Sequence, residues 1–188
     1  MPRPSREQID DEILEAAATL FARHGFKETS VQRIADAVGY SKTGLLHRYP
    51  SKESLQQAVV LRALREVREI GVRVADRPSG PDRDRAVLTG MARLALDLPG
   101  TVALLLSGLM STPEDGIGLA LDELAGVIFE LFRADPETEP ARCIRVVGAL
   151  GALAVVAVAM QEKPAPGSLD DLIEVSYDAL GHGRTTTH

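Results

Sequence analysis

The sequence predicts an all-α protein of about nine helices, with a small N-terminal helix-turn-helix domain followed by a C-terminal helical bundle. Apolar residues recur at helical spacing through most of the chain, and breaks containing proline or glycine separate the helical segments. No stretch shows the sustained alternation of apolar and polar residues that would require a strand. We expect residues 1–50 to form the first domain and residues 51–188 the second.

The first predicted helix begins after Ser5 and ends at Gly25. Ser5 and Gln8 have the spacing of a capping box, in which each side chain accepts a hydrogen bond from the other residue's backbone. The apolar residues that follow recur at helical spacing until Gly25, a residue type that commonly ends helices. We expect this helix to support the two that follow it.

Two shorter helices come next. Thr29 and Gln32 repeat the capping spacing, and the short apolar stripe after them ends at Gly39, so the second helix has about two turns. Ser41 can cap a third helix, which ends at or before Tyr49 because the residue preceding a proline is pushed out of the α region.

Ser51 can cap a long fourth helix that ends at the Pro78–Pro81 break. Further breaks rich in proline and glycine divide the remaining chain. We expect five helical segments there: Asp82 to Leu98, Thr101 to Met110, Pro113 to Ala134, Glu139 to Gln161 and Ser168 to Leu180.

Charge is distributed unevenly along the 188 residues. The chain has 21 Lys and Arg against 27 Asp and Glu, a net charge of −6, which excludes an argument from a globally basic protein. Residues 23–52 nevertheless carry a net +4, so the remainder carries −10. This asymmetry is typical of a small phosphate-facing patch on an acidic body.

The polar N-terminus and the single cysteine, Cys143, predict a cytoplasmic protein without disulfides. The uncharged run Val146 to Met160 has 15 residues, fewer than the roughly 20 that cross a bilayer. We therefore expect a buried helix and no membrane partner.

The turn near Gly39 would set the second and third helices at a steep angle, with the Ser41 end of the third helix in a DNA major groove. Lys42 and Thr43, in the first turn of that helix, are the residues that we expect to contact base edges. The competing interpretation is structural, because serine and threonine cap helices in any protein and lysines are common surface residues.

The segment GYSKTGLLHRYPSKESL, residues 39–55, resembles the DNA-binding signature of TetR-type transcriptional regulators, and the similarity extends over about residues 8–58. The resemblance implies a homodimer with an N-terminal three-helix reader and a C-terminal helical domain that binds a small molecule and releases DNA. Two features depart from the family pattern. Leu46 stands where an aromatic residue commonly touches phosphate, and Thr43-Gly44 reverses the common order.

We predict a set of DNA-contacting residues from this segment and its flanks. Residues around the second helix and at the start of the fourth are placed for phosphates, which fix register without reading sequence. The set is Thr29, Ser30, Arg33, Ser41, Lys42, Thr43, Gly44, His47, Arg48, Tyr49 and Lys52.

The C-terminal part gives two further predictions, each with an ordinary packed core as the alternative. Bulky apolar residues with two charged neighbours predict an effector pocket, for a modest apolar or amphipathic molecule since aromatic residues are only 4% of the chain: Met91, Arg93, Leu94, Leu105, Met110, Phe129, Glu130 and Phe132. The last two helices predict a four-helix dimer interface: Val147, Leu150, Gly151, Ala154, Val158, Leu169, Leu172, Ile173, Tyr177 and Leu180.

No pattern of catalytic residues, zinc-like Cys/His spacing or phosphate-binding glycine loop is present, so we expect neither an enzyme nor a cofactor or metal. The expected function is a ligand-responsive homodimeric transcriptional regulator, a repressor that binds a palindromic operator. The alternative is a helical protein-interaction module whose helix-turn-helix has lost DNA contact. A helical enzyme is a third possibility.

Overall fold

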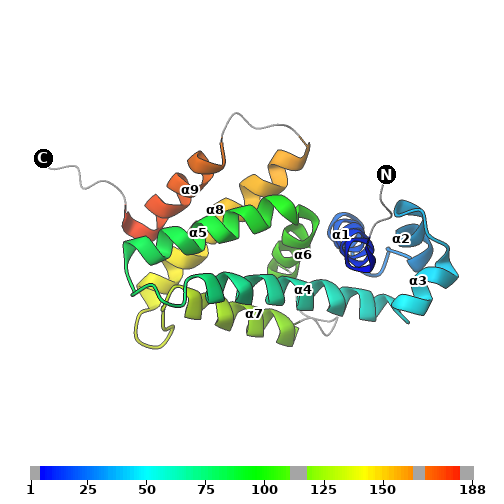
Figure 1. Ribbon diagram of the computed structural model, residues 1–188, viewed down its shortest axis with the longest axis horizontal. Coiled ribbons are helices and arrows are strands. Elements are labelled where there is room, and N and C mark those ends of the chain that lie inside the picture. The colour runs from blue at the N-terminus through cyan, green and yellow to red at the C-terminus, as the bar shows by residue number, and fades with distance from the viewer. Residues whose placement is uncertain (1–4, 111–117, 163–167, 183–188) are drawn as a thin grey trace, which may run out of the picture. The chain divides into compact units, whose positions relative to one another are not determined.

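The computed structural model describes residues 5–110, 118–162 and 168–182, and these residues contain helices and no strand (Figure 1). The predicted all-α class is confirmed. The elements are α1 (Arg6–His24), α2 (Val31–Ala37), α3 (Lys42–Arg48), α4 (Lys52–Arg73), α5 (Pro81–Asp97), α6 (Pro99–Met110), α7 (Gly118–Leu131), α8 (Pro140–Glu162), α9 (Leu169–Tyr177) and a π-helical turn, Asp178–His182.

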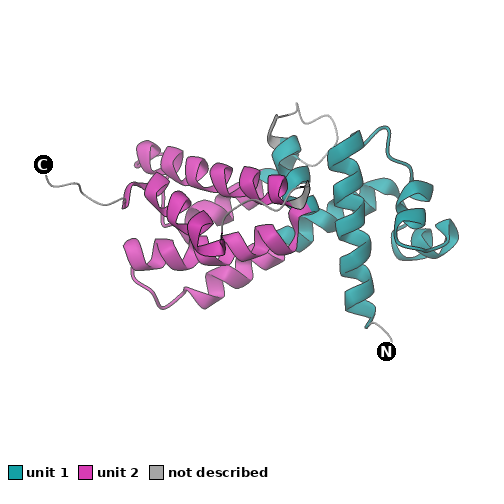
Figure 2. Ribbon diagram, turned by 90° about the horizontal axis from the view of Figure 1, so that it is seen from above, with its two compact units in different colours: residues 1–63, 100–121 teal, residues 64–99, 122–188 magenta. Residues whose placement is uncertain are grey.

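The chain divides into two compact units (Figure 2). Unit 1 consists of the described residues within 1–63 and 100–121, and unit 2 of those within 64–99 and 122–188. Leu55 and Val59 of α4 and Leu104 of α6 are buried in the core of unit 1, which explains why these segments group with the first three helices. The division into domains at residue 50 stays a prediction.

Local capping fixes the ends of the first helices. Ser5 and Gln8 form the predicted capping box, and Gly25 ends α1 with a positive φ of 79°. Ser41 caps α3 by accepting a hydrogen bond from the backbone N–H of Gly44, and Tyr49 is its C-terminal cap. These predictions from the sequence are confirmed.

The predicted cap of α2 was wrong by one residue. Ser30, and not Thr29, is the N-cap, and its hydroxyl accepts a hydrogen bond from the backbone N–H of Arg33. The Thr29 hydroxyl instead donates toward the carbonyl oxygens of Leu20 and Gly25, at 3.1 and 2.8 Å. Both residue types can cap a helix. Because the Thr29 hydroxyl donates to the two carbonyl oxygens at the end of α1, Ser30 caps α2.

Unit 2 is built around α5, α8 and α9, which pack on one another. Asp84 of α5 is fully buried in it, and Arg142 and His182 contact its carboxylate at 3.0 and 2.7 Å. Arg142 also donates to the carbonyl oxygen of Phe132. One buried carboxylate therefore ties α5 to α8 and to the C-terminal π-helical turn.

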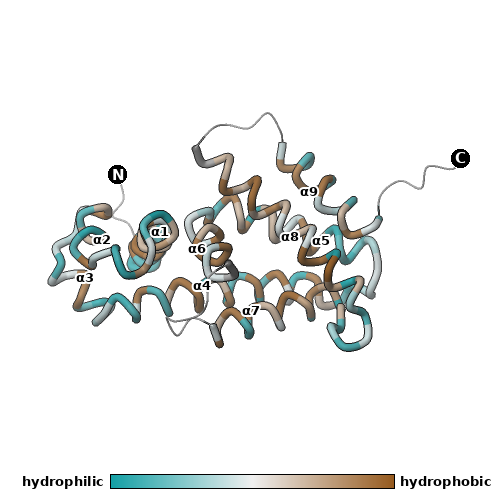
Figure 3. Tube along the Cα trace, turned by 180° about the vertical axis from the view of Figure 1, so that it is seen from behind, coloured by the Kyte–Doolittle hydropathy of each residue, from teal (hydrophilic) through white to brown (hydrophobic). Residues whose placement is uncertain are grey.

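The helix α8 is apolar over most of its length, as Figure 3 shows. The segment Pro140–Met160 is long and apolar enough to cross a bilayer by length and composition, and 28% of its most apolar window is buried within the protein. Val146, Ala149 and Leu153 on one face are buried, whereas Val147 and Val155 are 60% and 59% exposed. One side of α8 is thus core, and the other is open.

Removing the arginine from the buried ion pair should destabilise unit 2. We expect Arg142→Met to lower the free energy of unfolding by about 3 kcal/mol, because it leaves the Asp84 carboxylate buried without its guanidinium partner. Urea unfolding at fixed protein concentration measures this change. Arg93→Met, at an exposed position of α5, is the control, and an equal loss in both variants would contradict the expectation.

Candidate nucleic-acid interface

The N-terminal end of α3 is exposed. Ser41, Lys42 and Thr43 are all exposed, while Leu45, one turn further, is fully buried in the core of unit 1. A helix with Leu45 inside must present the side chains on its opposite face to solvent. The two residues predicted to contact bases therefore lie at an open helix end, with the geometry that a major groove accepts.

A tight turn joins α2 to α3. Gly39 has φ +70°, a conformation that favours glycine, and the backbone N–H of Tyr40 donates to the carbonyl oxygen of Ala35 at 2.9 Å. The helices α2 and α3 contact one another, and α2 contacts α1. This is the compact three-helix arrangement of a helix-turn-helix reader.

Gly44 has a local structural role in α3. A Cβ atom at this position would lie 3.1 Å from the Ser41 hydroxyl oxygen, which already accepts a hydrogen bond from the Gly44 backbone. Glycine at this position therefore gives the capping hydroxyl room. This explanation is compatible with the predicted close approach to DNA.

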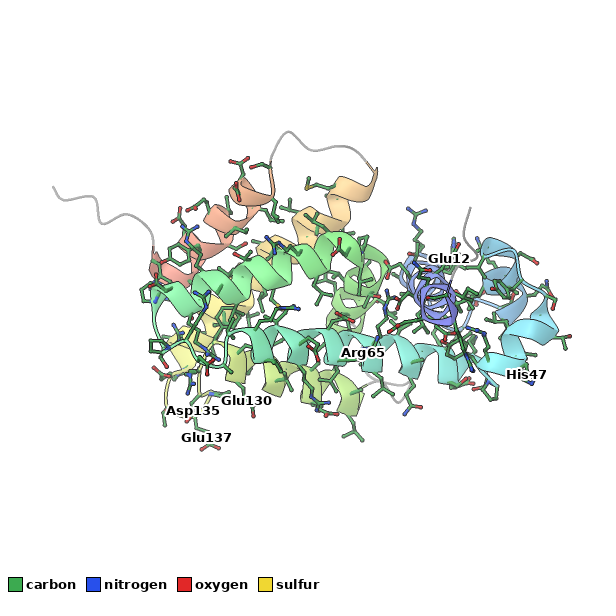
Figure 4. The ribbon with its side chains drawn as sticks, in the orientation of Figure 1. Glu12, His47, Arg65, Glu130, Asp135 and Glu137 are labelled. Atoms are coloured by element: carbon green, nitrogen blue, oxygen red, sulfur yellow. The ribbon has the colours of Figure 1, made fainter. Side chains whose placement is uncertain are left out.

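Cations and hydroxyl groups flank the exposed end of α3. Ser30 and Arg33 are exposed at the start of α2, and the Arg33 guanidinium lies 2.9 Å from the Nε2 atom of His24. His47, labelled in Figure 4, is exposed in the last turn of α3. Because these side chains are exposed, they can contact an anion without any rearrangement of the core.

Thr29 does not belong to this surface. Its side chain is 1% exposed, and its hydroxyl donates to carbonyl oxygens at the end of α1. A phosphate could reach it only if the end of α1 opened. Burial therefore removes Thr29 from the predicted set of DNA contacts.

Lys52 is half-buried, and its ammonium group is already engaged. It donates to the carbonyl oxygens of Phe26 and Lys27 at 2.6 and 3.2 Å, and it lies 4.4 Å from the centre of the Phe26 ring. These contacts hold the start of α4 against the loop after α1. The Lys52 ammonium could therefore bind a phosphate only through an N–H that these contacts do not use.

Asp10 of α1 holds the C-terminal end of α3. Its Oδ1 atom pairs with the Arg48 guanidinium and accepts a hydrogen bond from the Tyr49 hydroxyl at 3.3 Å. Burial, followed by the nearby charge of Asp10, raises the pKa of Tyr49 to about 12. Both Arg48 and Tyr49, predicted to contact DNA, thus also anchor the reading helix. No local pattern pointed to Asp10, because its partners are 38 and 39 residues away.

The residues predicted for the effector pocket lie in different surroundings. Phe132 is fully buried, Arg93 and Glu130 are exposed, and Met91, Leu94, Leu105 and Phe129 are half-buried. The side chain of Met110 lies outside the described residues. Unit 2 has an open cavity of about 640 Å³ lined from α4, α5, α7 and the turn after α7, to which only Glu130 of the predicted set contributes.

That cavity has Arg83 on its wall. The Arg83 side chain is buried and donates to the carbonyl oxygens of Val74, Arg77 and Leu131, at the ends of α4 and α7. Burial lowers its pKa from the ordinary value, as does the charge of Arg133. Its hydrogen bonds identify Arg83 first as a cap for two helix ends.

The residues predicted for the dimer interface divide by exposure. Leu172, Ile173 and Leu180 are 4–6% exposed, because their side chains are packed within unit 2. They leave almost no apolar surface for a second copy, so we remove them from the predicted interface. Val147 is exposed, and the rest are half-buried: Leu150, Gly151, Ala154, Val158, Leu169 and Tyr177. The sequence analysis missed Ile144, Val155 and Val175, which are 72%, 59% and 58% exposed. Their helical spacing from Val147 and Gly151 could have identified the first two.

Among the described residues, no group of three or more His, Cys, Asp or Glu side chains is arranged to hold a metal ion. Cys143 is buried on α8, which favours a packing role for its thiol.

Comparison with known proteins finds relatives of the N-terminal part of the chain. Residues 13–59 match the family model of bacterial regulatory proteins, tetR family. The transcriptional repressor KstR2 of Mycolicibacterium smegmatis is 44% identical over 50 residues, which are 27% of this chain and 24% of that protein. The match to this curated relative therefore spans about a quarter of its length.

Solved structures extend the likeness of the fold to most of the chain. The TetR family regulator PfmR of Thermus thermophilus has a TM-score of 0.66 and 24% identity, covering 91% of this chain and 97% of that one. AibR, solved in complex with isovaleryl coenzyme A and operator DNA, has a TM-score of 0.60 and 20% identity, covering 90% and 96%. At these identities the likeness shows the fold.

The raised pKa of Tyr49 predicts a pH-dependent loss of stability. Because the folded-state pKa lies above the ordinary value of 10.0, this phenol stabilises the fold fully below pH 10, and the contribution is lost as the pH rises through about 12. The difference between ultraviolet titrations of the native protein and Tyr49→Phe should isolate this group. Asp10→Asn should lower the midpoint of the Tyr49 titration. A Tyr49 midpoint near 10 in the native protein would refute the raised pKa.

Proposed function

We propose that this chain, whose residues 13–59 match the family model of bacterial regulatory proteins, tetR family, regulates transcription as a repressor by binding a palindromic operator as a homodimer. The observation that carries the proposal is the exposed N-terminus of α3, held over a buried core by α1. In this proposal Lys42 and Thr43 contact base edges in the major groove. The protein acts in the cytoplasm and without a membrane partner.

The proposed contacts to the DNA backbone come from the flanking surface. Ser30, Arg33, Ser41 and His47 are exposed and can contact phosphates, whereas Arg48, Tyr49 and Lys52 act mainly by holding α3 and α4 in place. Backbone contacts fix the position of the reader and make binding depend steeply on salt. A protein with a net charge of −6 can bind in this way because its positive charge is concentrated in residues 23–52.

We propose that the dimer forms through the open face of α8. Ile144, Val147, Gly151 and Val155 recur at helical spacing on this face, and Ile144 is 72% exposed. A contiguous exposed apolar stripe is typical of an interface between proteins. The opposite face of α8 is packed within unit 2, which leaves one stripe for a second copy of this chain. Half-buried residues of the predicted set, such as Leu150 and Ala154, border this stripe.

A small-molecule effector would release the operator in this proposal. The solved AibR complex contains both isovaleryl coenzyme A and operator DNA, and this supports an effector for the present chain by analogy of fold. We propose that effector binding displaces the segment Thr101–Met110 against α4. A coupling of about 1–3 kcal/mol would weaken operator binding by roughly five- to 150-fold.

Selection of bound sequences from random duplexes by the purified protein tests the DNA-binding proposal. We expect a near-palindrome with half-sites about one helical turn apart, since two readers related by twofold symmetry impose that spacing. Lys42→Ala and Thr43→Ala should each weaken the binding free energy by about 1–3 kcal/mol, and only for particular bases of the half-site. Uniform weakening across all sequences would reassign both residues to the DNA backbone.

The salt dependence of the affinity provides the control. Arg33→Ala should reduce the slope of log K against log salt by about one, whereas Lys52→Ala should change it less because the lysine ammonium is bonded within the protein. A native protein that binds no duplex even at low salt would instead favour the interaction-module alternative.

A charge on the open face of α8 should separate the dimer. We expect Val147→Asp to be monomeric in sedimentation velocity and to lose tight operator binding, because the carboxylate would be buried without a partner. Val72→Asp, at a 70% exposed valine of α4, is the matched control and should remain dimeric. A dimeric Val147→Asp with native operator affinity would place the interface elsewhere.

A further inference from the structure

The carboxylate of Glu15, on α1, closes the N-terminus of α6. Its Oε1 atom accepts a hydrogen bond from the backbone N–H of Gly100 at 2.5 Å. Its Oε2 atom accepts from the Thr101 hydroxyl at 2.7 Å and from the Thr101 backbone at 3.3 Å. A carboxylate is well suited to this position, because the first N–H groups of a helix lack partners and carry partial positive charge.

The close approach of α1 and α6 requires glycine at position 100. A Cβ atom there would collide with the Thr19 hydroxyl oxygen and would lie 2.8 Å from Oε1 of Glu15. Thr101, the next residue, is 2% exposed, so its hydroxyl depends on Glu15 for a partner in place of water. The sequence at the start of α6 therefore fits this carboxylate in both shape and hydrogen bonding.

The same carboxylate faces α4. Arg62 is 7% exposed, and its Nη1 atom lies 3.8 Å from Oε2 of Glu15. The guanidinium also contacts Asp11 on α1, through Nε to the carboxylate at 3.0 Å and through Nη1 to the carbonyl oxygen at 3.2 Å. Glu15 is thus shared between the start of α6 and a buried cation of α4.

One and a half turns earlier on the same helix, Asp10 holds Arg48 and Tyr49 at the end of α3. Five residues of α-helix separate Asp10 from Glu15 by about 7.5 Å along the axis. Because α1 is a continuous helix of 19 residues with both ends capped, its two acidic contacts move together. A displacement of α6 at Glu15 therefore reaches the reading helix through a single rigid element.

We infer that Glu15 is a positioning residue that couples the start of α6 to the orientation of α3, and so to DNA binding. The inference rests on the proposed function and deepens it by naming the contact through which the reader is regulated. When the α6 cap is intact, α1 is held between Arg62 and α6, and Asp10 fixes α3 for the groove. Coupling is reciprocal, so DNA that selects this orientation of α3 must also stabilise the cap.

Hydrogen exchange tests this coupling without an effector. The probe is the operator duplex obtained from the random selection, and the readout is the exchange rate of the Gly100 and Thr101 amides with and without that duplex. We expect the duplex to slow exchange at least about fivefold in the native protein, the lower end of ordinary coupling. In Glu15→Gln, which keeps the side-chain shape but removes the charge, the ratio should fall below about twofold.

Glu12→Gln is the matched control, because Glu12 is an exposed carboxylate on the same helix (Figure 4). It should keep the native exchange ratio and operator affinity, whereas Glu15→Gln should weaken operator binding. A merely structural Glu15 would lower the melting temperature of the variant but leave the ratio of exchange rates unchanged.

If the duplex left the exchange rates of the Gly100 and Thr101 amides unchanged in the native protein, the inference would be overturned, whether or not Glu15→Gln folds. Equal ratios in Glu15→Gln and Glu12→Gln would also overturn it. Failure to select any duplex would instead overturn the proposed DNA-binding function, so the two failures are distinguishable.

Discussion

The buried apolar face of α1 supports the two helices that would read DNA. Ile13, Ala17 and Phe21 are 0–2% exposed and share a core with Ile34 of α2 and Leu45 of α3. With seven residues each, α2 and α3 are too short to be stable as isolated helices. Their presence and their angle therefore depend on packing, and burial of Leu45 is what turns the first turn of α3 outward.

Polar side chains near the reader serve the domain as well as its surface. The hydroxyl of Thr29 and the ammonium of Lys52 satisfy carbonyl oxygens at and after the end of α1, while Asp10 orients Arg48 and Tyr49. Leaving a buried carbonyl oxygen without a hydrogen-bond donor costs more free energy than a contact with a surface phosphate gains. These side chains therefore form their hydrogen bonds within the protein. The side chains left for DNA are exposed ones such as Ser41, whose hydroxyl accepts the capping hydrogen bond and keeps its proton to donate.

The helix α8 illustrates how one composition fits several environments. Its length and hydropathy suit a bilayer, a protein core or a dimer interface equally well. Within unit 2, its buried face packs with α5 and α9, and Arg142 at its start pairs with the buried Asp84. Burial on one face and exposure on the other favour an interface with a second copy, and exposure is a property that hydropathy alone does not contain.

Local sequence patterns were enough to predict the helical class and most helix ends, including the start of α3 at Ser41, because capping and termination depend on residues three or four positions apart. Ser5 with Gln8, Ser41 with Gly44, and Gly25 all follow such local rules. Packing between distant segments made Ser30 the cap in place of Thr29, buried Leu172 and brought Glu15 to Thr101. These outcomes depend on carbonyls, packing faces and hydrogen bonds supplied by segments up to 86 residues apart, which no local pattern encodes.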